Sequence, residues 1–405
     1  MKKKNLNLNQ IVFLVLLTMS TLVTAVLFYR QAMYADRGYD SDINVYIEEM
    51  CGKAEGYLFP YPILFKAGAF INMLLSNPKY SMVLSLTLFN VAAIIIVFWL
   101  YRRELGDSIV VSVVSVSLFF VSMIFSEFFK KLGVEHYYLG VWTPNPWHNG
   151  TFLAARPFMI LAFYYCVKVL EEFDRNTEDG NIKDRIFTGL FLFLTTLTKP
   201  SYAVIHFLAL GIWELMRIFK YKGTVIKEIL ILACIYIPTI IAMLYQYIVV
   251  YINGDEVYSG EQGIGIGFMN AWGLYTNNLL LAVVLAIGFP LIVLLFNHNQ
   301  LKKDYEYKFS WILYLVALLT VVFLYEKGAK GEHFNFGWGY MASLFILYYT
   351  SAKKLISETI FTINSSISLN KVDFRLLIMW IYFLLHLGCG IIYFFMLING
   401  IGYMI

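Results

Sequence analysis

The first feature that could do chemistry is a cluster of acids near the start of the chain. Five carboxylates lie within fourteen residues, directly after the first long apolar run: Asp36, Asp40, Asp42, Glu48 and Glu49. Carboxylates that lie close together can have raised pKa values, which suits a general base. Asp40 and Asp42 also form an Asp-x-Asp pair that could hold a divalent cation. Asp42 and Asp40 are therefore candidate catalytic residues, and the competing interpretation is a solvated acidic loop.

Two cations stand at the edges of apolar runs. Arg156 lies about a turn and a half inside an apolar segment, where an arginine needs a partner or an anion. A guanidinium is a natural bidentate ligand of phosphate, although it could also snorkel to the interface. Lys199 precedes Pro200 at the tip of a predicted hairpin, where it could bind a lipid phosphate or serve as an anchor at the membrane interface. We predict that Arg156 and Lys199 converge on one anion pocket.

Two further segments mix aromatic and polar residues in a way that suits a sugar. One contains Trp147-His148-Asn149, and the other runs from Tyr325-Glu326 through Glu332-His333 to Trp338. Apolar faces of sugars stack on tryptophan, while their hydroxyls need acids, amides and imidazoles as hydrogen-bond partners. His148, Glu326, His333 and Trp338 are therefore candidate substrate-binding residues. The competing interpretation is a polar turn beside an interfacial aromatic belt.

The elements that must position these residues are membrane helices. Of the 405 residues 60% are hydrophobic and only 14% are charged, against about 25% charged in an ordinary soluble domain. Apolar runs recur from end to end, and the polar stretches between them are too short to bury a core of their own. We predict one integral membrane domain over residues 1–405, an all-α polytopic bundle with about eleven spans and short extracytoplasmic helical loops. The predicted spans are 10–29, 79–101, 108–126, 151–171, 186–199, 201–219, 227–250, 278–297, 309–325, 337–352 and 374–398.

The distribution of basic residues predicts the orientation. With the N-terminus in the cytoplasm, 20 of the 31 Lys and Arg residues fall in inside loops. Eleven spans then place the C-terminus and all candidate site residues on the extracytoplasmic side. The inside loops, among them 353–373, are interpreted as solvated connectors, and the apolar stretch 63–75 as a short interfacial helix.

The order of these features resembles the GT-C superfamily of membrane glycosyltransferases, particularly the bacterial enzymes that use polyprenyl-phosphate sugars. The resemblance rests on a basic N-terminus and one helix, then a loop with Asp42-x-x-x-Tyr46, Gly56-Tyr57 and Tyr61-Pro62, and a later Lys199-Pro200 hairpin. It covers mainly the first 75 residues and the hairpin near residue 200.

The resemblance implies a reaction. Asp42 or Asp40 would deprotonate an acceptor hydroxyl, which would attack the anomeric carbon of the donor sugar with inversion. Polyprenyl phosphate would leave, its charge held by Arg156 and Lys199. The expected partners are a polyprenyl-phosphate-linked sugar, a glycan, lipid or protein acceptor, and membrane lipid, with no nucleic acid.

Three other readings remain open from the sequence. An O-antigen or capsule polymerase also has many spans, but its large arginine-rich outer loop has no counterpart here. A transporter or flippase of lipid-linked sugars would place charges at mid-membrane depth and carry an internal repeat. A non-catalytic membrane scaffold is the third alternative.

Overall fold

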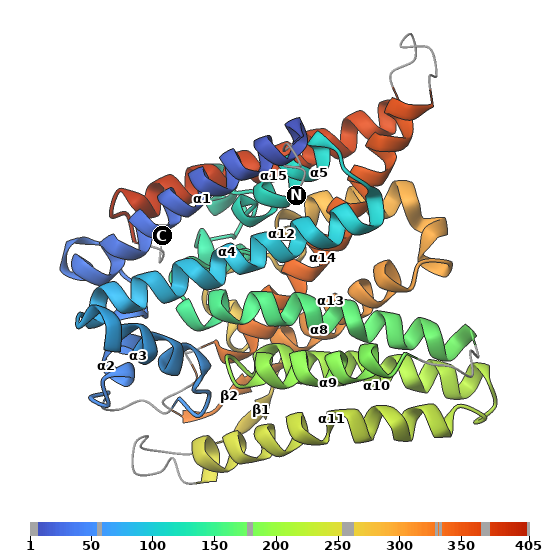
Figure 1. Ribbon diagram of the computed structural model, residues 1–405, viewed down its shortest axis with the longest axis horizontal. Coiled ribbons are helices and arrows are strands. Elements are labelled where there is room, and N and C mark those ends of the chain that lie inside the picture. The colour runs from blue at the N-terminus through green and yellow to red at the C-terminus, as the bar shows by residue number, and fades with distance from the viewer. Residues whose placement is uncertain are drawn as a thin grey trace, which may run out of the picture.

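Long helices running side by side make up most of the chain (Figure 1). The computed structural model describes residues 7–54, 59–175, 181–252, 263–328, 331, 334–365 and 373–402. Within these residues, eight helices are long and apolar enough to cross a membrane. They are α1 (Leu8–Met33), α4 (Pro78–Leu105), α8 (Gly150–Arg175), α10 (Ser201–Lys220), α11 (Ile226–Tyr247, continued to Ile252 by a π-helical turn), α12 (Leu279–Asn297), α13 (Tyr305–Phe323) and α15 (Phe374–Ile398).

Shorter elements complete the described part of the chain. The short ones are α2 (Ile43–Met50), α3 (Ile63–Leu75), α5 (Ile109–Ser117), α6 (Glu127–Lys130), α7 (Tyr138–Val141), α9 (Ile182–Thr196) and the antiparallel strands β1 (Ile264–Ile266) and β2 (Leu324–Glu326). Helix α14 (Asn335–Asn364) is long but more polar than the eight.

Each of the eleven predicted spans overlaps a helix, although residues 121–126 of the third are not helical, and eight spans are confirmed by length and composition. The other three differ from the prediction. Helices α5 and α9 are shorter than a span normally requires. Helix α14 continues from the predicted end at residue 352 to Asn364, so the interpretation of residues 353–364 as a plain connector is wrong.

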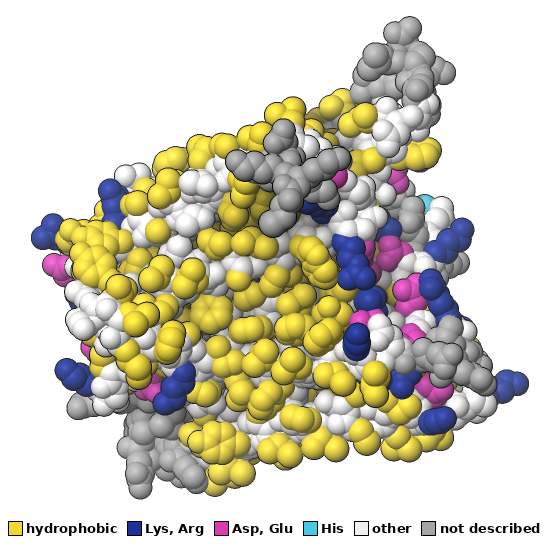
Figure 2. Space-filling model, viewed as in Figure 1, with side chains coloured by type: hydrophobic (Ala, Val, Ile, Leu, Met, Phe, Trp, Pro, Cys, Tyr) yellow, Lys and Arg dark blue, Asp and Glu magenta, His cyan; other side chains and the backbone are white. Residues whose placement is uncertain are grey.

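The surface is that of a multi-pass membrane protein. Figure 2 shows hydrophobic side chains over the middle of the visible face and charged side chains gathered toward its ends. Large apolar residues stay exposed along α1, α11 and α15, where water would leave a large sticky patch and lipid covers it. The all-α polytopic bundle is thus confirmed.

The two described ends of the chain lie at opposite ends of the bundle. Asn7, before α1, donates a hydrogen bond to Asp107, which follows α4. Arg30, at the other end of α1, donates to the carbonyl of Ile398 at the end of α15. We call the end that carries α2, α3 and the β1–β2 pair the loop end. That the opposite end faces the cytoplasm stays a prediction.

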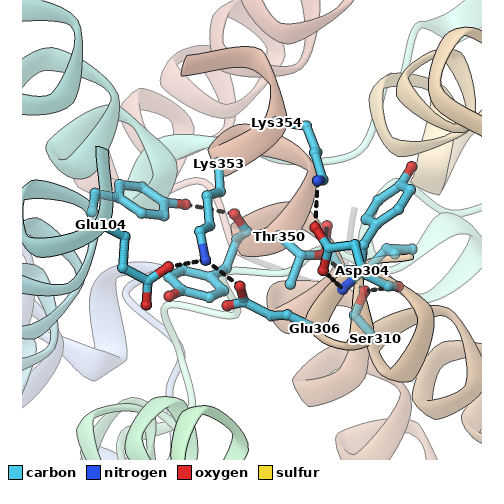
Figure 3. A network of polar contacts seen from close by, with 11 residues as sticks. Glu104, Asp304, Glu306, Ser310, Thr350, Lys353 and Lys354 are labelled. Atoms are coloured by element: carbon cyan, nitrogen blue, oxygen red, sulfur yellow. Dashed lines mark hydrogen bonds and ion pairs between the residues drawn. The ribbon is translucent and has the colours of Figure 1, made fainter. Parts of the chain in front are cut away.

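Ion pairs join the helices at that opposite end (Figure 3). Lys353 of α14 lies between Glu104 of α4 and Glu306 of α13, and Lys354 pairs with Asp304, the N-cap of α13. These side chains are mostly buried, so each lysine needs its carboxylate partners. The network holds α4, α13 and α14 together far from the loop end.

Past α5 the chain leaves the helical conformation over residues 121–126, and the first three of these residues are buried inside the bundle. Backbone without helix or strand pairing is tolerated at membrane depth only where protein groups satisfy it. The N–H of Ser122 donates to the His386 carbonyl (3.1 Å), and the N–H of Ile124 donates to the Leu285 carbonyl (3.0 Å). Gly390 of α15 permits this approach, because a Cβ there would lie 1.8 Å from the Phe120 carbonyl oxygen.

A kink in α12 frees backbone groups for hydrogen bonds with neighbouring helices. Backbone angles leave the helical region at Ile287, and Pro290 offers no N–H to the carbonyl of Ala286. The Tyr348 hydroxyl donates to that carbonyl (2.8 Å), and the Phe289 N–H donates to Nε2 of His386 (3.1 Å). His386 of α15 therefore connects α15 to α12 and α14, and both of its ring nitrogens have hydrogen-bond partners within the protein.

Candidate functional site

A cavity of about 610 Å³ opens among the loops at the loop end. Its wall brings together five of the predicted site residues from segments far apart in the sequence: Asp42, His148, Lys199, Glu326 and Trp338. Aromatic and aliphatic side chains from α10, α11 and α14 form much of the remaining wall. A mostly apolar cavity with a few convergent polar groups is the usual form of a small-molecule site.

Asp42 ends the first loop as the N-cap residue of α2. Its Oδ2 accepts hydrogen bonds from Asn149 Nδ2 (2.6 Å) and the Tyr46 hydroxyl (3.1 Å), and its own N–H donates to the His148 carbonyl (3.1 Å). No described residue donates to Oδ1, so one carboxylate oxygen is left for a ligand in the cavity. Burial raises the pKa of Asp42, while the positive charge of Lys199 and the two hydrogen bonds oppose that rise. A fixed carboxylate with a raised pKa suits a general base.

Lys199 enters the cavity from the turn between α9 and α10. Its Nζ donates to Thr151 Oγ1 (3.2 Å) and lies 4.3 Å from the centre of the Trp338 ring. Among the described residues no carboxylate lies within ion-pair distance of Nζ. Burial lowers the pKa of Lys199 to about 8, although the Asp42 carboxylate favours the charged form. A buried cation without a direct counter-ion in a cavity is suited to an anionic ligand.

Asn149 and Thr151 connect the acid to the cation. Thr151 Oγ1 accepts from Lys199 and donates to Asn149 Oδ1 (2.9 Å), while Asn149 Nδ2 reaches Asp42. Asn149 Oδ1 also accepts from the Phe152 N–H (2.9 Å) at the start of α8. Neither residue was among the sequence candidates. The signal was an Asn-Gly-Thr sequence directly before an apolar run, which is typical of a helix N-cap.

Aromatic rings form the wall behind Lys199. The His148 ring lies 5.6 Å from Trp338 and 4.8 Å from Tyr138, measured between ring centres. Burial, followed by the nearby charge of Lys199, lowers the pKa of His148 to about 3. His148 is therefore neutral at physiological pH and can act only as a hydrogen-bonding and stacking group there.

Glu326 occupies another part of the wall. It lies in β2 opposite Ile264 of β1, and its carboxylate accepts hydrogen bonds from the Tyr251 hydroxyl and Asn335 Nδ2. The side chain is buried, with 4% of its surface exposed. These two donors fix the carboxylate against the cavity. His333, which was predicted to join this group, lies outside the described residues.

Arg156 is not where the sequence led us to expect it. It does not line the cavity, and its side chain is fully buried in the bundle. Thr151 faces Lys199, and a residue five positions further along an α-helix points about 140° away from it. The prediction that Arg156 and Lys199 converge on one pocket is therefore wrong.

Asp40 also lies away from the cavity. Its side chain is exposed, and its Oδ2 lies 3.0 Å from the position that a Cβ on Gly402 would take. Asp40 and Asp42 thus face different surroundings, and the Asp-x-Asp pair does not act as one site. Within the described residues no three His, Cys, Asp or Glu side chains come together as metal ligands.

Comparison with solved structures finds distant similarity in fold. No protein-family model and no curated protein matches the sequence. The fold is similar to the crystal structure of ArnT from Cupriavidus metallidurans bound to undecaprenyl phosphate, with a TM-score of 0.44 and 10% sequence identity. The match covers 96% of this chain and 73% of that one. A similarity this distant assigns neither residue roles nor a substrate.

Proposed function

We propose that this protein is a membrane glycosyltransferase. It moves a sugar from a polyprenyl-phosphate carrier to a hydroxyl of an extracytoplasmic glycan, lipid or protein acceptor, with inversion at the anomeric carbon. The observation that carries the proposal is that one largely apolar cavity holds both a fixed carboxylate with a raised pKa and a buried lysine that no described carboxylate pairs with directly.

In this proposal Asp42 is the general base. Its Oδ1, to which no described residue donates, takes the proton of the acceptor hydroxyl as the acceptor oxygen forms a bond to the anomeric carbon. The bond from that carbon to the phosphate oxygen breaks at the same time, and polyprenyl phosphate leaves with the bonding electron pair. A single displacement from the face opposite the leaving group inverts the anomeric configuration.

Lys199 meets the charge that develops on the phosphate. Its Nζ is held by Thr151 and by the face of Trp338, so it is oriented before the leaving group departs. Preorganised charge in a site with little water is worth far more than the same charge in bulk water. Trp338 and His148 offer stacking surfaces, and Glu326 offers a fixed acceptor for sugar hydroxyls. His333 stays a predicted member of this group.

The test is transfer activity in proteoliposomes with a polyprenyl-phosphate-linked sugar as donor. Asp42→Asn keeps the shape of the residue but cannot accept a proton, so the rate should fall by about a hundredfold to ten-thousandfold. Asp40→Asn is the matched control, because Asp40 is an exposed acid of the same loop and lies off the cavity. Its rate should stay at the wild-type level.

Two results would contradict this proposal. Full activity of Asp42→Asn would remove the base assignment. Movement of the intact lipid-linked sugar across the membrane, with no glycosidic bond made or broken, would instead identify a flippase.

A further inference from the structure

We propose that Arg156 is a positioning residue, the buried clamp of the segment 143–149 that presents Asn149 to the cavity. This inference rests on the proposed function, because it concerns how Asp42 is held for the reaction. It assigns Arg156 a role different from phosphate binding and adds Asn145 and Asn90 as the partners through which that role is carried out.

The surroundings of Arg156 are those of a clamp. Its Nη1 donates to Asn145 Oδ1 (2.6 Å) and its Nη2 to Asn90 Oδ1 of α4 (2.7 Å). The guanidinium carbon lies 5.0 Å from the ring centre of Phe119 and 5.5 Å from that of Trp147. No described carboxylate pairs with this arginine. Two amides and aromatic rings thus surround the cation, which is fully buried and does not line the cavity.

Asn145 links Arg156 to the backbone of another segment through hydrogen bonds. While its Oδ1 accepts from Arg156, its Nδ2 donates to the carbonyls of Leu118 (3.2 Å) and Val121 (2.9 Å), where α5 has ended. Both ends of the amide are therefore occupied. Arg156 thereby orients a side chain that, together with the Thr143–Ser122 hydrogen bond (2.8 Å), ties the segment 143–149 to the chain where α5 has ended.

Residues 143–149 in turn fix the position of Asp42. Every residue from 141 to 150 is buried, and Pro144 and Pro146 restrict the backbone on either side of Asn145. Three residues beyond Pro146, Asn149 Nδ2 donates to Asp42 Oδ2 (2.6 Å). The carbonyl before it, that of His148, accepts the N–H of Asp42. The clamped segment thus sets both the backbone and the carboxylate of the proposed base.

Arg156→Met tests the clamp, because methionine fills a similar length without charge or donors. Misplacing a reacting group by about 1 Å costs on the order of a hundredfold in rate. We expect kcat to fall about a hundredfold, with the Kd for polyprenyl phosphate unchanged. Arg156→Lys keeps the charge but not the two-armed fork, so it should recover only part of that loss. A Kd weakened tenfold or more at unchanged kcat would overturn the proposal and return Arg156 to phosphate binding.

Hydrogen exchange provides a readout that needs no turnover. The backbone N–H groups of the non-proline residues in 143–149 should exchange faster in Arg156→Met. They should also do so in Asn90→Ala, which removes one partner of the arginine while leaving the arginine in place. Leu170→Ala is the control, since it opens a buried cavity near the other end of α8 without touching the segment. It should lower thermal stability but leave the exchange of 143–149 unchanged.

Hydrogen exchange tests the Arg156 clamp, and transfer activity tests the proposed glycosyltransferase function, so the two proposals can fail separately. Unchanged exchange in a folded Arg156→Met or Asn90→Ala protein would overturn the clamp even if transfer activity is found. Faster exchange in a protein that transfers no sugar would support the clamp while the proposed function fails.

Discussion

The buried charge of Lys199 predicts a specific loss of ligand binding at alkaline pH. Burial lowers the pKa of Lys199 to about 8, against the opposing attraction of Asp42. The cation is therefore present below that pH and is lost as the pH rises through it. A phosphate that depends on this cation should bind well at pH 7 and weakly at pH 9.

The size of the effect follows from the pKa. About nine tenths of Lys199 is protonated one pH unit below its pKa and about one tenth one unit above it, so the charged fraction falls roughly tenfold between pH 7 and pH 9. If only the charged form binds, the Kd for polyprenyl phosphate rises about tenfold, equivalent to about 1.4 kcal/mol. A phosphate monoester has a second pKa of about 6, so the charge of the ligand changes little between pH 7 and pH 9.

The assay is titration of the protein in nanodiscs with polyprenyl phosphate at several pH values. Lys199→Arg keeps its charge through pH 9 and should bind with nearly constant affinity. Lys66→Arg is the matched control, because Lys66 is an exposed lysine of α3 at the same end of the bundle. It should keep the wild-type pH dependence. A wild-type affinity that is flat from pH 7 to 9, or a loss that persists in Lys199→Arg, would refute the reasoning.

Three further predictions concern the scaffold. Gly38 has φ +86°, and a Cβ there would lie 2.2 Å from a backbone carbonyl oxygen, so Gly38→Ala should lower the melting temperature more than Gly52→Ala. The latter has φ +68° but open space around it, and should cost only the roughly 1–2 kcal/mol of left-handed strain. His386→Ala leaves a buried N–H and a buried carbonyl unpaired, at about 1–3 kcal/mol each, whereas exposed His298→Ala should be neutral in thermal unfolding. Equal melting temperatures for the two glycine variants, or for the two histidine variants, would contradict the corresponding prediction. Reporters fused after residues 101 and 399 should read cytoplasmic and extracytoplasmic, and one compartment for both would exclude the predicted orientation.

The helices and the chemistry of the loops could be predicted from the sequence because both depend on local properties. In lipid, a backbone must satisfy its hydrogen bonds within its own segment, so a long apolar run forms a helix wherever it is placed. The acids fall between such runs, and Lys199 and Trp338 fall at the ends of runs, which places Asp42, Lys199 and Trp338 at one end of the bundle once the helices alternate.

The direction in which a side chain points was decided by the tertiary structure. Hydropathy shows that Arg156 lies in an apolar helix, but only the packing of α4 and the segment 143–149 shows that it meets two amides instead of a ligand. The early end of α5 likewise depends on Asn145 and on His386 in α15, which lies some 240 residues further along the chain. Asn149 became part of the site because the start of α8 packs against the first loop. Hydrophobic period and charge report how one segment meets lipid or water, whereas a binding site is made by contacts between segments, and those depend on the packing of the whole bundle.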